Sequence, residues 1–282
     1  MNRTMITATN TMSQIQHKMD IIGHNISNVQ TNGFKRKESY FNDLLVQQFE
    51  TMGRADRENG RLTANGVRQG TGAKISQAKI LLTQGSLKTT DRDLDVALKK
   101  KDLFFKVLVQ GEQEQSVNFT RDGAFYLSPD SQNPNNMMVV TGNGYPVLDE
   151  FDDPIVVNGN IKEIAFSENG QLRVTSHDGG AETFNLGIVS VKKPQFLEQI
   201  GGNLLGFPAN MDELAVAEGN IVTALTGAAR GEISLQQRSL EASNVDLSKE
   251  MTDLMNMQRH YQFQARSITL ADQMQSLVNG IR

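Results

Sequence analysis

The stretch MITATNTMSQIQHKMDIIGHNISNVQTNGF, residues 5–34, decides the fold of the chain. Its apolar residues recur at alternating steps of three and four, which is the a/d pattern of a heptad repeat. The repeating positions are Met5, Ala8, Met12, Ile15, Met19, Ile22, Ile26 and Val29. Because the residues between them are mostly polar, the apolar stripe is narrow, and such a helix needs other helices to bury it.

The pair Asn32-Gly33 predicts where this helix ends. Asparagine and glycine favour the left-handed backbone conformation that terminates helices. The periodic pattern stops at the same place, and Phe34 and Lys35 follow it. We therefore expect the helix to end at Asn32-Gly33.

A second periodic segment lies near the other end of the chain. It has the same spacing at Leu247, Met251, Leu254, Gln258, Tyr261, Ala265 and Ile268. Past Ile268 the apolar positions shift in phase to Leu270, Met274, Leu277 and Ile281. Residues 243–246, Ser-Asn-Val-Asp, fit the acidic form of a capping box, which marks a helix start. The sequence thus predicts two helices that bracket everything else and bury their stripes against partner helices.

Composition excludes several classes of protein. The 282 residues allow one large or two modest domains, and the net charge is −4. With no long basic run, that charge argues against a general nucleic-acid binder. The absence of cysteine excludes disulfides, thiolate metal sites and cysteine nucleophiles. No apolar stretch reaches the roughly 20 residues that span a bilayer, and the N-terminus lacks a secretory signal pattern, so we expect no membrane insertion.

The middle of the chain predicts an extended connector followed by a β domain. Residues 35–72 are polar, turn-prone and rich in glycine. From Ala73 onward, turn signals separate short candidate strands at residues 78–82, 103–109, 137–140, 164–166, 172–174 and 188–191. We therefore expect an α+β chain with a mainly antiparallel β domain at 73–230. Coiled-coil-forming helices at 1–34 and 231–282 flank it, and 35–72 is the connector.

Few residues suggest chemistry. Asp91, Asp93 and Asp95 have the spacing that opens a calcium loop, but Val96 and Asp102 replace the required glycine and glutamate. A solvated acidic turn is the favoured interpretation. Glycines at 70 and 72 and at 142 and 144 lack the continuation of a phosphate-binding loop, so they are interpreted as turn glycines.

The histidines also show no catalytic or metal-binding pattern. His17, His24, His177 and His260 lack metal-ligand spacing, and no Gly-x-Ser-x-Gly elbow supports a nucleophilic serine. We therefore expect no catalytic, cofactor-binding or metal site, and no cofactor.

Several motifs resemble one known family. Residues 25–35, NISNVQTNGFK, resemble the N-x-A-N-x-x-T-x-G-[FY]-K signature of the bacterial flagellar rod and hook proteins. Residues 243–251, 258–261 and 271–274 look like the C-terminal signature of that family. Residues 119–125, 141–147 and 201–205 are similar to its middle region. Residues 43–45 and 66–72 most resemble its distal-rod branch, whereas Lys99–Asp102 departs from the glycine-containing turn that the family usually has before Phe104-Phe105.

The resemblance implies a structural subunit of the flagellar basal body rather than an enzyme. It would be exported through the flagellar secretion channel without a cleaved signal peptide. Its termini would be mobile in the monomer and pair as helices on assembly, forming a shaft that transmits torque to the hook. The implied partners are copies of itself, neighbouring rod and hook subunits and the flagellar export apparatus, with no nucleic acid.

The stripes and the signature define the expected assembly interface. Its residues are Met5, Met12, Ile15, Met19, Ile22, Asn25, Ile26, Asn28, Val29, Gly33, Phe34, Leu247, Met251, Leu254, Tyr261, Ile268, Met274 and Leu277. Alternatives are a hook or proximal-rod subunit of the same family, or a coiled-coil adaptor whose β domain binds a ligand. An enzyme using the acidic turn at Asp91–Asp95 is the least supported.

Overall fold

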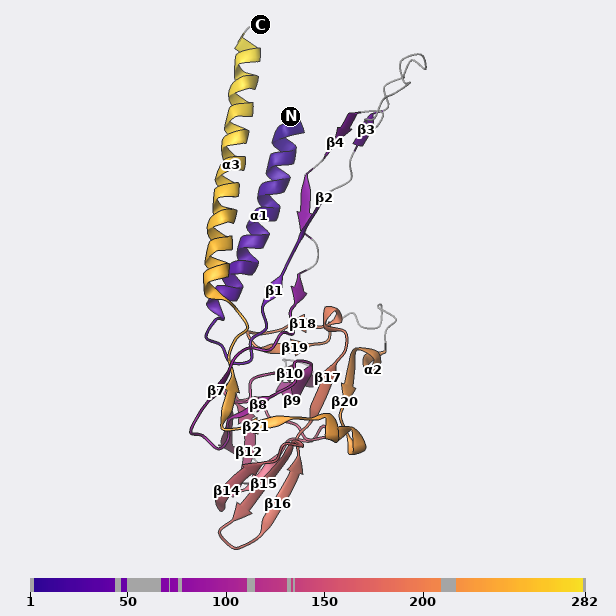
Figure 1. The fold of residues 1–282 in the computed structure, drawn as a ribbon, viewed down its shortest axis with the longest axis vertical. Coiled ribbons are helices and arrows are strands. Elements are labelled where there is room, and N and C mark those ends of the chain that lie inside the picture. Colours follow the sequence, from indigo (N-terminus) through magenta and orange to yellow (C-terminus); the bar gives the residue numbers. More distant parts are fainter. Residues whose placement is uncertain are drawn as a thin grey trace. The chain divides into compact units, whose positions relative to one another are not determined.

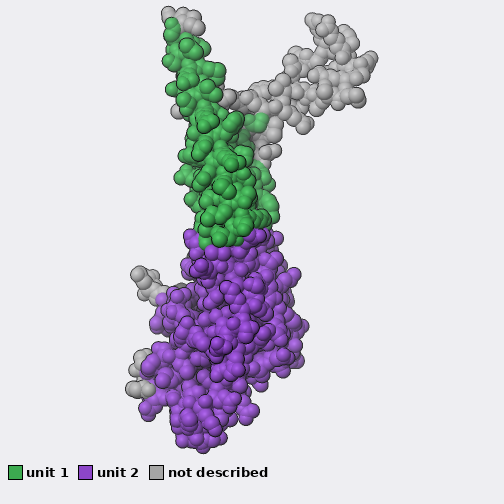
Figure 2. Space-filling model, turned by 60° about the vertical axis from the view of Figure 1, so that its left-hand side comes forward, with its two compact units in different colours: residues 1–26, 37–78, 247–282 green, residues 27–36, 79–246 purple. Residues whose placement is uncertain are grey.

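The computed structural model describes residues 3–43, 47–49, 67–70, 72–75, 78–110, 115–130, 133, 135–208 and 217–280. Residues 50–66 of the predicted connector, Leu44 and Leu45 of the distal-rod motif, and Ile281 lie outside these described residues. The chain divides into two compact units, coloured separately in Figure 2. Unit 1 comprises residues 1–26, 37–78 and 247–282, and unit 2 comprises 27–36 and 79–246. The division expected from the sequence, into 1–34, 35–72, 73–230 and 231–282, stays a prediction.

Two antiparallel helices dominate unit 1 (Figure 1). They are α1, Arg3–Ser27, and α3, Leu247–Gly280. At about 1.5 Å per residue, α1 is ~38 Å long and α3 is ~51 Å long. The capping-box residues 243–246 mark the start of α3 only approximately: a box with Ser243 as N-cap would begin the helix at Asn244, whereas α3 begins at Leu247.

The first helix ends earlier than the sequence predicted. Its last residue is Ser27, so Val29 and the Asn32-Gly33 pair lie beyond it. In the turn that follows, the Thr31 backbone N–H donates to Asn28 O at 3.2 Å. The Thr31 hydroxyl donates to Asn28 Oδ1 at 3.2 Å. Such local side-chain bonds favour a turn over continued helix. Gly33 does adopt the expected left-handed conformation, with φ of 68°.

Short strands of unit 1 occupy the described part of the connector. β2, Phe41–Asp43, pairs with β5, Ala73–Ile75, and Phe41 lies opposite Ile75. β3, Gln47–Phe49, pairs with β4, Val67–Gln69. β1 is Lys37–Glu38. The extended backbone expected for this region is present, in the form of antiparallel ladders.

A six-stranded antiparallel sheet forms the centre of unit 2. Its spatial order is β18-β19-β10-β9-β17-β20. The strands are β9 (Leu103–Gln110), β10 (Gln115–Thr120), β17 (Ile188–Val191), β18 (Glu198–Gln199), β19 (Leu204–Gly206) and β20 (Val222–Ala224). A four-residue helix α2, Glu218–Ile221, leads into β20. In the register of this sheet, Phe105 of β9 faces Thr120 on one side and Ile188 on the other.

Smaller ladders complete unit 2. Two three-stranded sheets have the orders β11-β12-β13 and β14-β15-β16, and two further pairs are β21-β8 and β22-β7. The strands are β6 (Lys79–Ile80), β7 (Leu87–Thr89), β8 (Val96–Leu98), β11 (Phe125–Pro129), β12 (Asn136–Thr141), β13 (Val156–Asn158), β14 (Ile161–Phe166), β15 (Gln171–Ser176), β16 (Ala181–Asn185), β21 (Leu235–Gln237) and β22 (Ser239–Glu241). Every candidate strand predicted from the sequence overlaps a strand of unit 2, and the mainly antiparallel β domain is confirmed.

The core of unit 2 is built around β9. Residues Leu103–Val107 are all buried, because both faces of this central strand are covered. Phe105 and Phe125 pack edge to face at 5.2 Å between ring centroids. Fully burying one such side chain contributes about 1.5–3 kcal/mol. Among the described helices, none combines the length and apolar character needed to cross a membrane.

Candidate assembly surfaces

The stripe of α1 is buried unevenly within unit 1. Ala8, Ile15 and Ile22 are buried, at one-heptad intervals. The alternate positions Met5, Met12, Met19 and Ile26 are only half-buried. The heptad therefore does form a packed face inside one chain, and half of its positions retain exposed apolar surface.

The β2–β5 ribbon packs on a neighbouring side of α1. The Ile75 backbone N–H donates to Gln14 Oε1 at 3.0 Å. The Lys18 ammonium lies 4.8 Å from the centre of the Phe41 ring, a cation–π contact. A Cβ on Gly72 would lie 3.6 Å from Thr7 and Thr11, so the ribbon runs close to the helix there. These contacts bury a side of α1 that the heptad pattern did not identify.

The buried face of α3 differs from the predicted stripe. Glu250 and Ala271 are buried. Leu254, Tyr261 and Ile268, which the prediction contained, are half-buried together with Met257 and Gln264. These residues again follow steps of three and four, but Leu247 and Met251 lie outside the face and are exposed. The buried seam is thus rotated relative to the predicted one, and it includes polar Glu250 and Gln264, which the apolar pattern left out.

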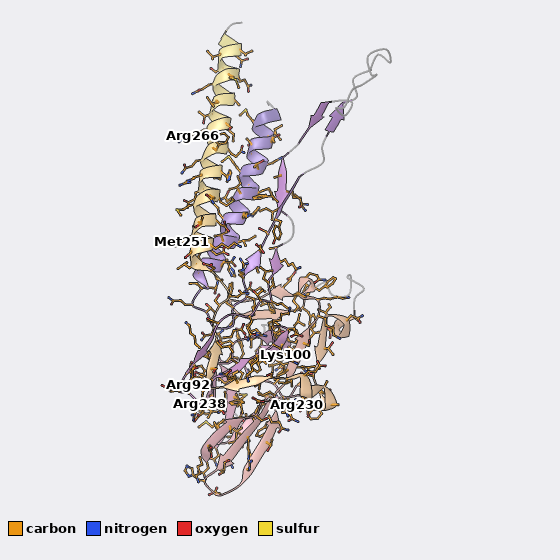
Figure 3. The ribbon with its side chains drawn as sticks, in the orientation of Figure 1. Arg92, Lys100, Arg230, Arg238, Met251 and Arg266 are labelled. Atoms are coloured by element: carbon orange, nitrogen blue, oxygen red, sulfur yellow. The ribbon has the colours of Figure 1, made fainter. Side chains whose placement is uncertain are left out.

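A second, exposed apolar face runs along α3. Its large side chains are Leu247, Met251, Met255, Phe263, Leu270, Met274, Leu277 and Val278, which are 43–69% exposed. Figure 3 shows Met251 on this helix, together with Arg266 from a later turn. Every described residue after Ala271 is exposed, since α3 is longer than α1. Monomeric proteins rarely leave so many apolar side chains along one element in water, so this face is a candidate interaction surface.

Asn25 of the signature joins the ends of α1 and α3. Its side-chain amide donates to Lys37 O at 2.9 Å and to Glu250 Oε2 at 3.3 Å, and its Oδ1 accepts the Lys37 N–H at 3.0 Å. Because Asn25 is buried and fully engaged, its role within the chain is to fasten the base of the helix pair.

Gly33 and Phe34 of the signature are enclosed by unit 2. Phe34 is 0% exposed. The Gly33 N–H donates to Glu241 O at 2.8 Å. A Cβ on Gly33 would lie 2.5 Å from the carbonyl carbon of Arg121. Both residues were expected at the assembly interface, and within the chain they hold the signature loop in place.

Substitution of Gly33 by alanine is expected to lower the free energy of unfolding by at least about 3 kcal/mol. About 1–2 kcal/mol comes from the left-handed φ and the remainder from the overlap with the Arg121 backbone. Gly144→Ala is the matched control, because Gly144 has φ of 83° and nothing within 4 Å of the added Cβ. Urea unfolding followed by circular dichroism measures both. Equal losses in the two variants would show that the close approach contributes nothing.

A buried ionic cluster lies beneath the signature loop. Lys35 Nζ is 2.7 Å from Glu241 Oε1, and Arg121 Nε donates to Glu241 Oε2 at 2.8 Å. All three side chains are at most 3% exposed. The Gly85 N–H also donates to Glu241 Oε1 at 2.8 Å. The Glu241 carboxylate therefore binds three residues that are far apart in the sequence, namely Lys35, Gly85 and Arg121.

Arg121 extends this cluster to the strand ends. Its Nη1 donates to Lys100 O at 2.5 Å and to Leu103 O at 2.7 Å. Lys35 Nζ donates to Thr83 O at 2.8 Å. In the sequence, Lys35 and Arg121 were noted only as members of the motifs at 25–35 and 119–125, and Glu241 was missed. Their charge within otherwise apolar or turn-forming motifs was the feature that could have indicated a buried ionic cluster.

Burial changes the acidity of this cluster. Desolvation, together with the nearby Arg121 guanidinium, lowers the pKa of Lys35 to about 8, although the Glu241 carboxylate acts in the opposite direction. Desolvation also lowers the pKa of Arg121, again against the effect of Glu241. The folded chain therefore releases the Lys35 proton more readily than the unfolded chain does.

Wild type is expected to gain stability relative to Lys35→Met as the pH rises from 8 to 10.5. The folded pKa lies below the unfolded value of 10.5, so the cost of a charged Lys35 is fully present below about pH 8. It is lost as the pH approaches 10.5, with a slope on the order of 1 kcal/mol per pH unit. Urea titrations of both proteins at several pH values measure the difference. A difference that does not change over this range would contradict the shift.

Asn244 of the C-terminal signature ties two more segments together. Its amide donates to Leu81 O at 2.9 Å and to Thr83 O at 3.0 Å, and its Oδ1 accepts the Arg36 N–H at 2.8 Å. The N-terminal and C-terminal signatures therefore meet in unit 2, next to the ionic cluster.

The aspartates and histidines that were considered as metal or catalytic candidates form no such site among the described residues. Asp93 pairs with Arg238 at 2.6 Å and is exposed, but Asp95 is only 2% exposed and pairs with Arg92 at 3.2 Å. The expected solvated turn is therefore wrong for Asp95, because Arg92 compensates its burial. His17 and His24 are exposed, as expected of a polar helix face. No group of histidine and acidic side chains that could hold a metal occurs within the described ranges.

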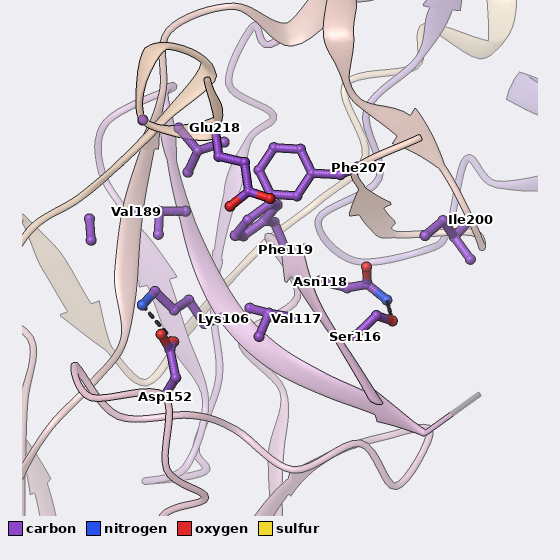
Figure 4. A pocket seen from close by; sticks show the side chains of 13 residues that line it. Lys106, Ser116, Val117, Asn118, Phe119, Asp152, Val189, Ile200, Phe207 and Glu218 are labelled. Carbon is purple, nitrogen blue, oxygen red and sulfur yellow. Dashed lines mark hydrogen bonds and ion pairs between the residues drawn. The ribbon is translucent and has the colours of Figure 1, made fainter. Parts of the chain in front are cut away.

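One hollow of about 610 Å³ opens on the six-stranded sheet (Figure 4). The Lys106–Asp152 ion pair, 2.6 Å long, lies on its wall. The remaining lining is mostly apolar or neutral and comes from Ser116, Val117, Asn118, Phe119, Val189, Ile200, Phe207, Glu218, Gly219, Val222 and Ala224. Its only carboxylates within the described residues are Asp152, which is paired, and Glu218 on the rim helix α2.

Three family models match the chain in order. "Flagella basal body rod protein" matches residues 5–35, and "Flagellar hook protein FlgE/F/G D1 domain" matches 102–174. "Flagellar basal body rod FlgEFG protein C-terminal" matches 236–281. The first and third models cover the signatures that meet around Asn244 and Glu241.

Curated relatives match over nearly the whole chain. The flagellar hook-basal body complex protein FlhP of Bacillus subtilis is 42% identical, over 100% of both chains. The flagellar basal-body rod protein FlgG of Borreliella burgdorferi is 30% identical over 100% of this chain and 99% of its own length. FlgG of Caulobacter vibrioides is 31% identical over 98% of each.

Proposed function

Because the chain belongs to the family of flagellar basal-body rod and hook proteins, we propose that it polymerises through its terminal helices as a subunit of the distal rod. It is a structural protein of the basal-body rod and not an enzyme. The finer assignment to the distal rod rests on the likeness to proteins named FlgG. In that position the polymer transmits torque to the hook.

The exposed apolar face of α3 is the observation that carries this proposal. Leu270, Met274 and Leu277, near the end of α3, are 58–69% exposed. The half-buried methionines of α1 add a second incompletely covered surface. Helices of neighbouring copies would cover both. In a helical polymer such contacts are heterologous and repeat without closing.

The proposal includes a change of state on assembly. Isolated helices are marginal in water, so the overhanging end of α3 gains most of its stability from neighbouring subunits. The flagellar export apparatus and adjacent rod and hook subunits are the other proposed partners. Limited proteolysis of the purified monomer is expected to cut the ends of the helices first and to leave a fragment near residues 79–246. A monomer whose helix ends resist protease as well as this fragment would contradict folding on assembly.

The position in the rod is tested by electron microscopy of basal bodies from a strain that lacks this chain. A truncated rod without a hook is the expected result for a distal-rod subunit. A complete rod that lacks only the hook would favour the hook alternative, and loss of the whole rod would favour a proximal one. Complete basal bodies would favour the adaptor alternative, for which sedimentation would show a discrete helical dimer.

A further inference from the structure

Four exposed lysines lie next to the place where β9 begins and β17 ends. Ser190 lies opposite Leu103, and the Val191 N–H donates to Asp102 O at 2.8 Å. Beyond this last bonded pair the ladder ends, and the chain continues as Lys192 and Lys193 after β17, while Lys100 and Lys101 precede Asp102 at the start of β9. We call these four side chains the lysine patch. Figure 3 labels Lys100 among them.

The lysine patch is held rigidly although its charges repel. Like charges held close together repel each other and are destabilising. The Lys99 N–H donates to Ser234 O at 2.8 Å, and buried Arg121 donates to Lys100 O at 2.5 Å. Asp102, the nearest carboxylate in sequence, instead accepts the Ser190 hydroxyl at 3.0 Å. Among the described residues no carboxylate pairs with the four lysines, so the patch is suited to an anionic partner.

Unit 2 also presents an acidic turn with an aromatic tip. Residues 149–153 read Asp-Glu-Phe-Asp-Asp, and Phe151 at the tip is 76% exposed. Asp149 Oδ1 accepts the N–H groups of Phe151 at 2.8 Å and Asp153 at 3.0 Å. Asp152 is fixed by its 2.6 Å ion pair with Lys106, which Figure 4 shows. The conformation of the acidic turn is therefore fixed by its own hydrogen bonds and ion pair. Asp153 has no cation partner among the described ion pairs.

The acidic turn and the lysine patch are separate surfaces of one unit. The turn reaches β9 at Lys106, five positions beyond Lys101, which is roughly 16 Å along a strand. Because the lysines lack carboxylate partners and Phe151 is exposed, the two surfaces do not satisfy each other within one chain. Complementary patches at different places on one molecule produce open, head-to-tail contacts.

We propose that the acidic turn of one copy docks on the lysine patch of the next copy in the polymer. This inference rests on the proposed function and adds to it a contact between the β domains, beyond the terminal helices. Charge complementarity within the chain identifies the partner. Unit 2 contains more acidic than basic residues, so a long anionic polymer would be repelled around the patch, whereas a compact acidic turn contacts only the lysines.

Photo-cross-linking of the full chain tests the contact directly. Phe151 is replaced by p-benzoylphenylalanine in flagellated cells, and basal bodies are isolated and irradiated. The expected product has the mass of two chains and joins residue 151 to a peptide that contains residues 99–101 or 192–193. Products confined to one chain, or joined elsewhere, would overturn the inference. If the chain is absent from isolated basal bodies, the proposed function itself fails.

Charge reversal provides the second readout. Lys101→Glu and Asp153→Lys are each expected to lower the yield of rods at least tenfold, and the double variant is expected to restore much of it. Lys162→Glu, an exposed lysine elsewhere on unit 2, is the matched control. Single variants that behave like this control would overturn the inference. Loss in Lys101→Glu with no effect of Asp153→Lys would also overturn it, and would identify an anionic polymer as the partner.

Discussion

Replacing Glu241 by glutamine is expected to lower the free energy of unfolding of unit 2 by about 3–5 kcal/mol, because it leaves two buried cations without their carboxylate. Lys35 and Arg121 both pair with Glu241, and their side chains are at most 3% exposed. Native domains are stable by only about 5–15 kcal/mol. The loss is therefore large enough to unfold a substantial fraction of the β domain.

Hydrogen exchange of the β9 and β10 amides, together with urea unfolding, measures this effect. Glu182→Gln is the matched control. Glu182 is exposed, so this substitution removes the same charge without leaving a buried group unpaired. Lys35→Met should be milder, since the Arg121–Glu241 pair remains. A Glu241→Gln protein as stable as the control would show that the cluster does not hold the three segments together.

The second large effect is expected on assembly. The double variant Leu270→Asp, Leu277→Asp should form no rods and should abolish swimming, while the monomer keeps its helix content. Both side chains are at least 60% exposed, so the monomer loses little by the change. In an assembled shaft each buried leucine contributes about 1.5–3 kcal/mol, and burying two carboxylates instead costs more. The expected fall in affinity exceeds about 100-fold.

Two comparisons make this result interpretable. Ser276→Asp adds a charge to the same exposed end of α3 away from the apolar side chains, and should assemble. Ile22→Asp places a charge in the buried stripe of α1, and should disrupt unit 1 itself as well as assembly. Normal motility of the double variant, with rods of normal length, would exclude the α3 face as an assembly surface.

Family likeness and fold class could be predicted from local pattern. The stripe from Met5 to Ile26, the capping box before Leu247 and the turn signals of the β domain each depend on residues close in sequence. They identified both helices, the antiparallel middle and the left-handed Gly33. The end of α1 was misplaced, because the Asn28–Thr31 turn competes with the helix through side-chain bonds that periodicity does not register.

Which face of each helix is buried was decided only by the tertiary structure. The predicted stripe on α3 assumed that apolar spacing defines the seam, yet buried Glu250 lies in the seam because Asn25 provides it with a hydrogen bond. The β2–β5 ribbon covers a polar side of α1 that no heptad pattern marks. In both cases a contact between residues distant in sequence compensates a polar group, and such compensation cannot be seen from spacing.

The sequence by itself therefore determined the elements, their order and the family of this chain, because those depend on local periodicity and on short motifs of neighbouring residues. Only the tertiary structure decided that Lys35, Arg121 and Glu241 share one buried site, and that four lysines flank the adjoining ends of β9 and β17. Charges interact through distance in space. Lys35 and Glu241 are separated by 206 positions in the sequence, and no local pattern predicts that their side chains lie 2.7 Å apart.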